Sequence, residues 1–101
     1  MRTANKLATV HPGQVLMEEF LKPLSLSIER LAQDTHVSIQ HIQELVREER
    51  GVTAEMALRL ARYFDMSPQF WLGLQMDYDL DVMSDTLAEQ VAREVKALVT
   101  A

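Results

Sequence analysis

The apolar and polar positions of the chain alternate with the period of helices. Apolar side chains recur three or four residues apart in five consecutive segments, which start near His11, Ser27, Ser38, Thr53 and Ser67. Such spacing gathers the apolar side chains on one face of a helix. The starts carry helix-initiating signals, either a serine or threonine that caps the first turn or a proline that suits it. The pattern therefore predicts five compact helices around one core.

An additional helix is predicted at the C-terminus. Aspartates crowd the segment Asp77–Asp81, where negative charge would oppose the dipole of a helix end, so the fifth helix is expected to stop near Tyr78. Ser84 then starts a sixth, amphipathic helix, which either covers its own domain, forms a dimer seam or contacts another protein. Its apolar stripe consists of Leu87, Val91, Val95 and Leu98.

Composition agrees with an all-α protein. The 101 residues include three glycines, three prolines and no cysteine, which excludes disulfides and thiolate metal sites. No apolar run is long enough to span a membrane and the start lacks the apolar core of a signal peptide, so a cytoplasmic location is expected. We expect a flexible arm at residues 1–10, a helix-turn-helix domain at 11–80 with the motif at 27–46, and a C-terminal helix at 81–101.

Charge divides the chain into two parts. The net charge is −5, yet residues up to Arg62 hold eight basic and eight acidic side chains. The remaining residues hold two basic and seven acidic side chains, so the excess acid lies in the C-terminal third. This asymmetry predicts a neutral end that can approach phosphate and an acidic end suited to a basic partner.

The segment from Ser27 to Val46 has the size and pattern of a DNA-reading helix-turn-helix. Ser27 and Ser38 are the expected caps of its two helices. Ala32 is small enough to let the helices cross closely, and residues 35–37 form the corner. The pattern alone is equally compatible with an exposed helix of a protein-binding module.

The surrounding residues carry a more specific signature, in the stretches HPGQVLMEEFLKPLSLSIERLAQDTHVS and GVTAEMALRLARYFDMSPQFWLGLQMDYDL. From His11 to about Leu80 the chain resembles the HigA (VapI-type) antitoxins, a branch of the Xre/Cro-type helix-turn-helix proteins. The resemblance implies a five-helix Xre/lambda-repressor-like DNA-binding domain with an additional C-terminal amphipathic helix. It also implies a homodimer that represses its own operon through operator DNA and neutralises a HigB toxin, a RelE-type ribonuclease.

The same resemblance maps the recognition helix onto residues 38–46. Gln40 is then placed to pair with adenine, Glu44 to accept from cytosine N4, and Ile39 to touch a thymine methyl group. Arg47 and Arg50 are candidates for phosphate, although they may equally balance the two neighbouring glutamates as a solvated charge run. The full set of expected DNA contacts is Ser38, Ile39, Gln40, Gln43, Glu44, Arg47 and Arg50.

The chain departs from the family pattern at the corner and after the recognition helix. His36 stands where the family usually has glycine, which costs about 1 kcal/mol if the corner needs a positive φ. Glu48 and Glu49 stand where basic residues are common, and with Glu44 they weaken the expected phosphate contact. We therefore expect operator binding to be weak without a second dimer or the toxin.

Other candidate chemistry gains little support. The three histidines have no metal-binding spacing, and the chain has no nucleophile motif or phosphate loop, so no metal, cofactor or enzymatic activity is expected. An aromatic pair at the start of the fifth helix is typical of a core, although part of it may line a dimer seam. The candidate dimer residues are Phe70, Trp71, Leu74 and Tyr78.

Three functions follow from these features. The leading one is an antitoxin that represses transcription. The second is a toxin-binding module whose DNA contacts have decayed, which the glutamates near the recognition helix favour. The third is a stand-alone Xre-type regulator with no toxin partner. A short neighbouring reading frame that is toxic when expressed alone would favour the antitoxin, and its absence would favour the stand-alone regulator.

Overall fold

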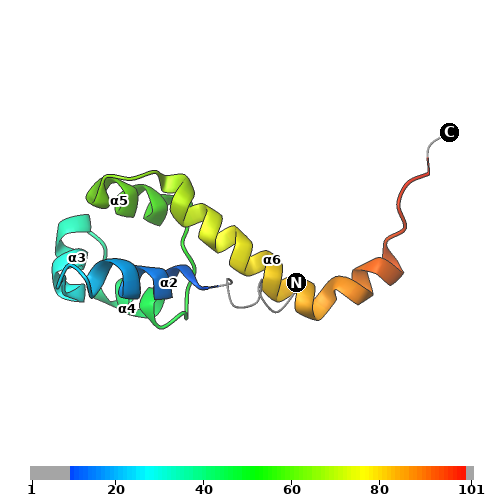
Figure 1. Ribbon diagram of the computed structural model, residues 1–101, viewed down its shortest axis with the longest axis horizontal. Coiled ribbons are helices and arrows are strands. Elements are labelled where there is room, and N and C mark those ends of the chain that lie inside the picture. The colour runs from blue at the N-terminus through cyan, green and yellow to red at the C-terminus, as the bar shows by residue number, and fades with distance from the viewer. Residues whose placement is uncertain (1–9, 100–101) are drawn as a thin grey trace.

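The computed structural model of the chain describes residues 10–99 (Figure 1). The described residues form helices and no strand, which confirms the all-α class. The elements are α2 (Pro12–Val15), η1 (Leu16–Leu21), α3 (Ile28–Thr35), α4 (Ile39–Val46), α5 (Ala54–Phe64) and α6 (Pro68–Glu94). The expected arm at residues 1–10 lies outside the described residues, apart from Val10.

α2 and η1 form one continuous helix, which starts as an α-helix and widens into π-helical turns. The widening is visible in the hydrogen bond from the Lys22 N–H to the Met17 carbonyl, 3.0 Å long and five residues back. Leu16 and Leu21 are buried on its inner face, as their spacing predicts. The helix ends just before Pro23, which cannot continue it.

α3 and α4 form the predicted helix-turn-helix. Ser27 Oγ accepts from the Arg30 N–H at 3.0 Å, and Ser38 Oγ accepts from the His41 N–H at 3.1 Å, so both expected caps are confirmed. His36 forms the corner with φ 60° and ψ 42°, a left-handed conformation that favours glycine. The corner therefore does need the positive φ that the family glycine would supply without strain.

The core lies where these helices meet α5 and the first turns of α6. Trp71 is fully buried, which confirms the core interpretation for this aromatic residue. Phe20 packs beside it with ring centres 5.1 Å apart, and also against Phe64 at 4.7 Å. Other fully buried apolar side chains include Leu16, Leu31, Ile42, Leu45, Ala57 and Leu60.

α6 corrects the sequence-based expectation. It runs without a break for 27 residues, so both the predicted stop near Tyr78 and the predicted new helix at Ser84 are wrong. No glycine or proline occurs between Gly73 and the end of the helix. The aspartates therefore lie in mid-helix, away from the C-terminal turn where the dipole would penalise them. One of them, Asp79, even accepts a helix-stabilising hydrogen bond from Gln75 Nε2 at 2.9 Å.

The second half of α6 projects from the rest of the molecule (Figure 1), whose extents are 56 × 29 × 23 Å. It therefore does not fold back over its own domain, which was one of the three placements considered. Its apolar side chains remain 39–60% exposed. We call this set the α6 stripe: Leu80, Met83, Leu87 and Val91. Within residues 10–99, no helix is long and apolar enough to cross a membrane.

Candidate nucleic-acid interface

α4 presents one face to the core and the opposite face to solvent. Ile42 and Leu45 are fully buried, whereas Ser38, Ile39 and Gln40 are exposed, Ile39 by 43%. An isoleucine so exposed at the start of a helix suits contact with an apolar group on another molecule, such as a thymine methyl. The recognition-helix residues expected from the sequence thus lie on the accessible side, except that Gln43 and Glu44 are half-buried.

Glu44 gathers two other predicted site residues around its carboxylate. Its Oε2 accepts from Gln40 Nε2 at 2.9 Å, and its Oε1 accepts from Arg50 Nε at 2.9 Å and Nη2 at 2.8 Å. The hydrogen bond from Gln40, followed by that from Arg50, lowers the pKa of the Glu44 carboxyl group. Arg50 is therefore paired with Glu44, and not with either glutamate of its own loop.

The loop between α4 and α5 is held by α6. Gln75 Oε1 accepts from the Val52 N–H at 2.7 Å, and its amide lies so close to Gly51 that a Cβ there would approach within 2.7 Å. The same amide group donates to Asp79, so its orientation is fixed. The sequence analysis missed this role, because a glutamine at an ordinary helical position gives no signal of a contact 23 residues away.

The His-Pro-Gly segment joins α4 to α6. The buried His11 ring caps α2, since its Nδ1 accepts from the Gly13 N–H at 2.9 Å, and its burial lowers its pKa. The ring also meets Tyr78 of α6 edge-on, with centres 4.9 Å apart. Gly13 lies against the C-terminal end of α4, where a Cβ would collide with the Leu45 carbonyl group. From the sequence this segment is interpreted as a helix start and as part of the family signature, without any signal of its contacts with α4 and α6.

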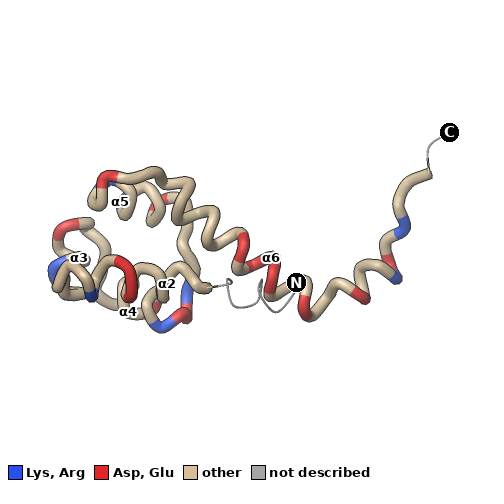
Figure 2. The backbone as a smooth tube through the Cα atoms, in the orientation of Figure 1, with Lys and Arg blue, Asp and Glu red and all other residues tan. Residues whose placement is uncertain are grey.

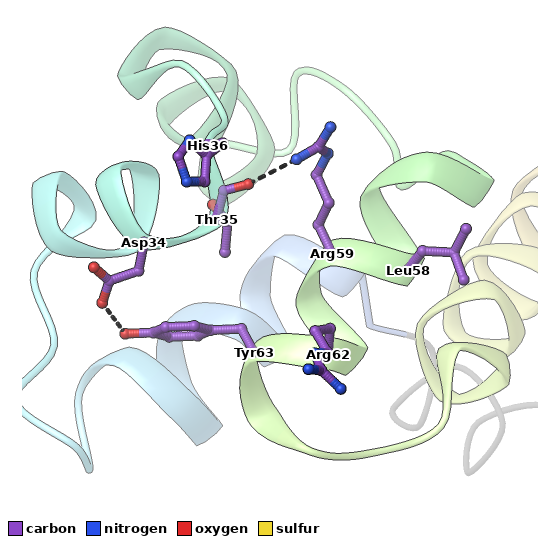
Figure 3. Close-up of a pocket in the computed structure, with 7 residues that line it drawn as sticks. All are labelled: Asp34, Thr35, His36, Leu58, Arg59, Arg62 and Tyr63. Atoms are coloured by element: carbon purple, nitrogen blue, oxygen red, sulfur yellow. Dashed lines mark hydrogen bonds between the residues drawn. The ribbon is translucent and has the colours of Figure 1, made fainter.

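A pocket of about 310 Å³ lies between the corner of the motif and α5 (Figure 3). Arg59 reaches across it, and its Nη1 donates to the Thr35 carbonyl at the end of α3 at 3.0 Å. Tyr63 donates its hydroxyl proton to Asp34 Oδ2, which also accepts from Arg30 Nε at 2.7 Å. These bonds lower the pKa of Asp34. The polar groups of this pocket thus brace α3 against α5.

Charges follow the asymmetry expected from the sequence. Figure 2 shows acidic positions spaced along α6, while basic positions occur around α3 and in the loop after α4. Arg47 is exposed at the C-terminal cap of α4 and has no ion-pair partner among the described residues. Its guanidinium group is therefore available for an external anion such as phosphate.

The four candidate dimer residues lie in different environments. Trp71 is enclosed by its own chain, Leu74 and Tyr78 are half-buried, and Phe70 is 42% exposed. A role for them at a dimer interface stays a prediction. Within residues 10–99, no three histidine or acidic side chains lie close enough to hold a metal ion.

Comparison with known proteins places this arrangement among helix-turn-helix proteins. A family model described as "Helix-turn-helix" matches residues 17–71. Virulence-associated protein I of Dichelobacter nodosus is 45% identical over 95 residues, which is 94% of this chain and 83% of that protein. Antitoxin HigA-1 of Vibrio cholerae is 34% identical over 76 residues, covering 74% of this chain and 70% of that protein.

The fold is also similar to that of a solved relative. The structure described as Pseudomonas aeruginosa antitoxin HigA with the higBA promoter has 41% sequence identity and a TM-score of 0.86. The similarity covers 90% of this chain and 99% of that one. Such coverage includes the recognition helix, the loop after it and most of α6.

Proposed function

The chain belongs to the HigA and VapI branch of the Xre-type helix-turn-helix family, and on that basis we propose that it is an antitoxin that also represses transcription. In this proposal it binds operator DNA through α4 and neutralises a HigB-type toxin. The observation that carries the DNA-binding part is the exposed face of α4, where the side chains of Ile39 and Gln40 are accessible to base edges.

The proposed contacts divide into two kinds. Ile39, Gln40 and Gln43 read base edges in the major groove, where an isoleucine meets a thymine methyl and a glutamine pairs with adenine. Ser38 and Arg47 bind phosphate, which fixes the register of the protein without specifying sequence. Since few cations face the DNA, the contribution of phosphate contacts is small and base readout carries a correspondingly larger share of the binding.

We further propose that the chain acts as a homodimer joined through α6. Two copies related by a two-fold axis would cover the α6 stripe of each, with Phe70, Leu74 and Tyr78 nearer the domain. Antiparallel pairing would bring Arg93 near the end of one helix toward the aspartates near the middle of the other. The two recognition helices would then enter successive major grooves of a palindromic operator.

The repressor part is tested by DNA binding. The wild-type chain is titrated against a duplex taken from upstream of its own reading frame and against a shuffled duplex, at stated salt. We expect a clear preference for the upstream duplex, and loss of that preference in the double variant Gln40→Ala, Arg47→Ala. A wild-type chain without preference would overturn the repressor proposal and favour a purely protein-binding module.

The antitoxin part is tested by co-expression. The short reading frame next to this gene is expressed alone and then together with this chain. Growth arrest that this chain relieves supports the antitoxin. A neighbouring product that is harmless on its own would contradict it and favour a stand-alone regulator.

A further inference from the structure

Glu44 holds its two neighbours in an arrangement that the proposed DNA contacts do not explain. A carboxylate on a surface that faces phosphate is repelled by it, and this one remains charged because Gln40 and Arg50 both bind its anionic form. Glu44 is half-buried, whereas the Gln40 and Arg50 side chains bonded to it are exposed. In this arrangement the Glu44 carboxylate fixes the positions of Gln40 and Arg50, which are the more exposed groups.

The hydrogen-bonding capacity left on the two neighbours is what DNA recognition requires. Gln40 uses one proton of its amide nitrogen on Glu44 and keeps its other proton and its amide oxygen. That donor and acceptor pair matches the N6 and N7 edge of adenine. Arg50 uses the edge made by Nε and Nη2, and it keeps the opposite edge of its guanidinium group for a base or a phosphate.

We propose that Glu44 is a positioning residue that presents Gln40 and Arg50 to DNA, and that it does not itself read a base. This inference rests on the proposed operator-binding function. It replaces the expectation that Glu44 accepts from cytosine N4, because both of its oxygens already accept from Gln40 and Arg50 and its side chain is less exposed than that of Arg50. Glutamine and arginine have many rotamers, so fixing them before DNA arrives removes part of the entropy cost of binding.

The positioning role predicts an effect opposite in sign to that of simple electrostatics. If Glu44 merely repels DNA, then Glu44→Ala tightens binding to every duplex alike. If Glu44 positions its neighbours, Glu44→Ala frees Gln40 and Arg50 to adopt many rotamers. Binding to the upstream duplex then weakens relative to the shuffled one, even though a negative charge has been removed.

The experiment measures fluorescence anisotropy with labelled upstream and shuffled duplexes over a series of salt concentrations. We expect Glu44→Ala to lower the preference for the upstream duplex by roughly tenfold, the size of one lost bidentate contact. Glu44→Gln keeps an acceptor for Gln40 but not the ion pair with Arg50, so its loss should be smaller. The matched control is Glu49→Ala, which removes a nearby exposed carboxylate and should affect both duplexes alike.

A second comparison separates positioning from direct readout. Glu44→Ala is added to a chain that already carries Gln40→Ala and Arg50→Ala. If Glu44 acts through these two residues, its removal causes no further loss of preference. A further loss would show that Glu44 reads a base and would overturn the inference.

The remaining outcomes are also decisive. Unchanged or increased preference in Glu44→Ala, with a wild-type chain that discriminates, overturns the role of Glu44 and leaves the proposed function standing. A wild-type chain that does not discriminate overturns the proposed function and this inference with it. Thermal melts of each variant test whether the substitutions leave the fold intact.

Discussion

At the scale of single residues, four of the helices begin at a serine or threonine whose side chain accepts from a backbone N–H of the first turn. Thr53 caps α5 and Ser67 caps α6, as Ser27 and Ser38 cap the helices of the motif. These caps depend only on a side chain and a backbone N–H two or three residues away, so one chain segment contains all the information. Contacts between distant segments, such as those of His11, lack such a local signal.

Gly13 and Gly73 provide a matched test of close packing. In Gly13→Ala the new Cβ collides with the Leu45 carbonyl, so we expect a loss of about 1–3 kcal/mol in the free energy of unfolding and weaker DNA binding as α4 shifts. A Cβ added at Gly73 would meet no atom outside the adjacent helix backbone within 4 Å, and Gly73→Ala should stabilise the helix by about 1 kcal/mol. Urea unfolding of both variants measures the difference. Equal effects would contradict the close contact.

His11 should make the stability of the fold depend on pH. Its ring must be neutral to accept from the Gly13 N–H, and burial lowers its folded-state pKa below the ordinary value of 6.5. The unfolded chain therefore binds the proton more readily, and the contribution of His11 is complete above pH 6.5 and decreases as the pH falls through the folded-state value.

This expectation is tested by unfolding midpoints measured from about pH 8 to about pH 5, which is the range in which histidine titrates. His11→Asn keeps a cap acceptor that does not titrate, so its midpoint should depend less on pH over the same range. His41, whose pKa burial also lowers, adds a residual dependence that the variant and the wild type share. An identical pH profile for the variant and the wild type would rule out the role of His11.

At the scale of helices, the sequence predicted the elements correctly until the last third of the chain. The motif, its corner and α5 follow from apolar period and capping residues. The predicted break within α6 failed because the aspartates were judged as if they ended a helix. A pattern of charges cannot show whether a helix continues, whereas the absence of glycine and proline favoured continuation.

At the same scale, Gln75 links α6 to the loop between α4 and α5. Gln75→Ala removes the acceptor of the Val52 N–H and should release the loop between α4 and α5 while leaving α6 intact. Hydrogen exchange at the Val52 amide should then accelerate, by about fivefold for a bond worth about 1 kcal/mol. Gln90→Ala is the control, because the hydrogen bond that Gln90 donates to Glu94 lies within α6. Unchanged exchange in Gln75→Ala would exclude this link.

At the scale of the whole molecule, the chain has two parts with different environments. The helices before α6 and its first turns enclose a continuous core, whereas the second half of α6 has exposed apolar side chains along its length. Sequence periodicity predicted Leu87 and Val91 of this stripe correctly, but it also included Val95 and Leu98, which lie beyond the end of α6 at Glu94. It did not identify what the stripe covers. The same period serves a core, a dimer seam and a partner surface equally well.

The α6 stripe predicts the oligomeric state. Leu87→Asp combined with Val91→Asp places charge in the middle of the proposed dimer seam, and we expect it to convert the dimer to monomer in light scattering after size-exclusion chromatography. Binding to the upstream duplex should weaken as the second recognition helix is lost. Glu89→Gln, between the two positions, is the control. A variant that remains dimeric would place the seam elsewhere.

The projecting half of α6 also has a consequence for how long a chain survives in a cell. The apolar side chains of its stripe are 39–60% exposed in a solitary copy, so we expect this part of the helix to open at a lower free energy than the core. Proteases cleave such segments in proportion to the open population. Assembly that covers the helix therefore lengthens the lifetime of the chain. The steady-state amount of protein then rises more steeply than its rate of synthesis, and a brief pause in translation depletes unpaired copies first.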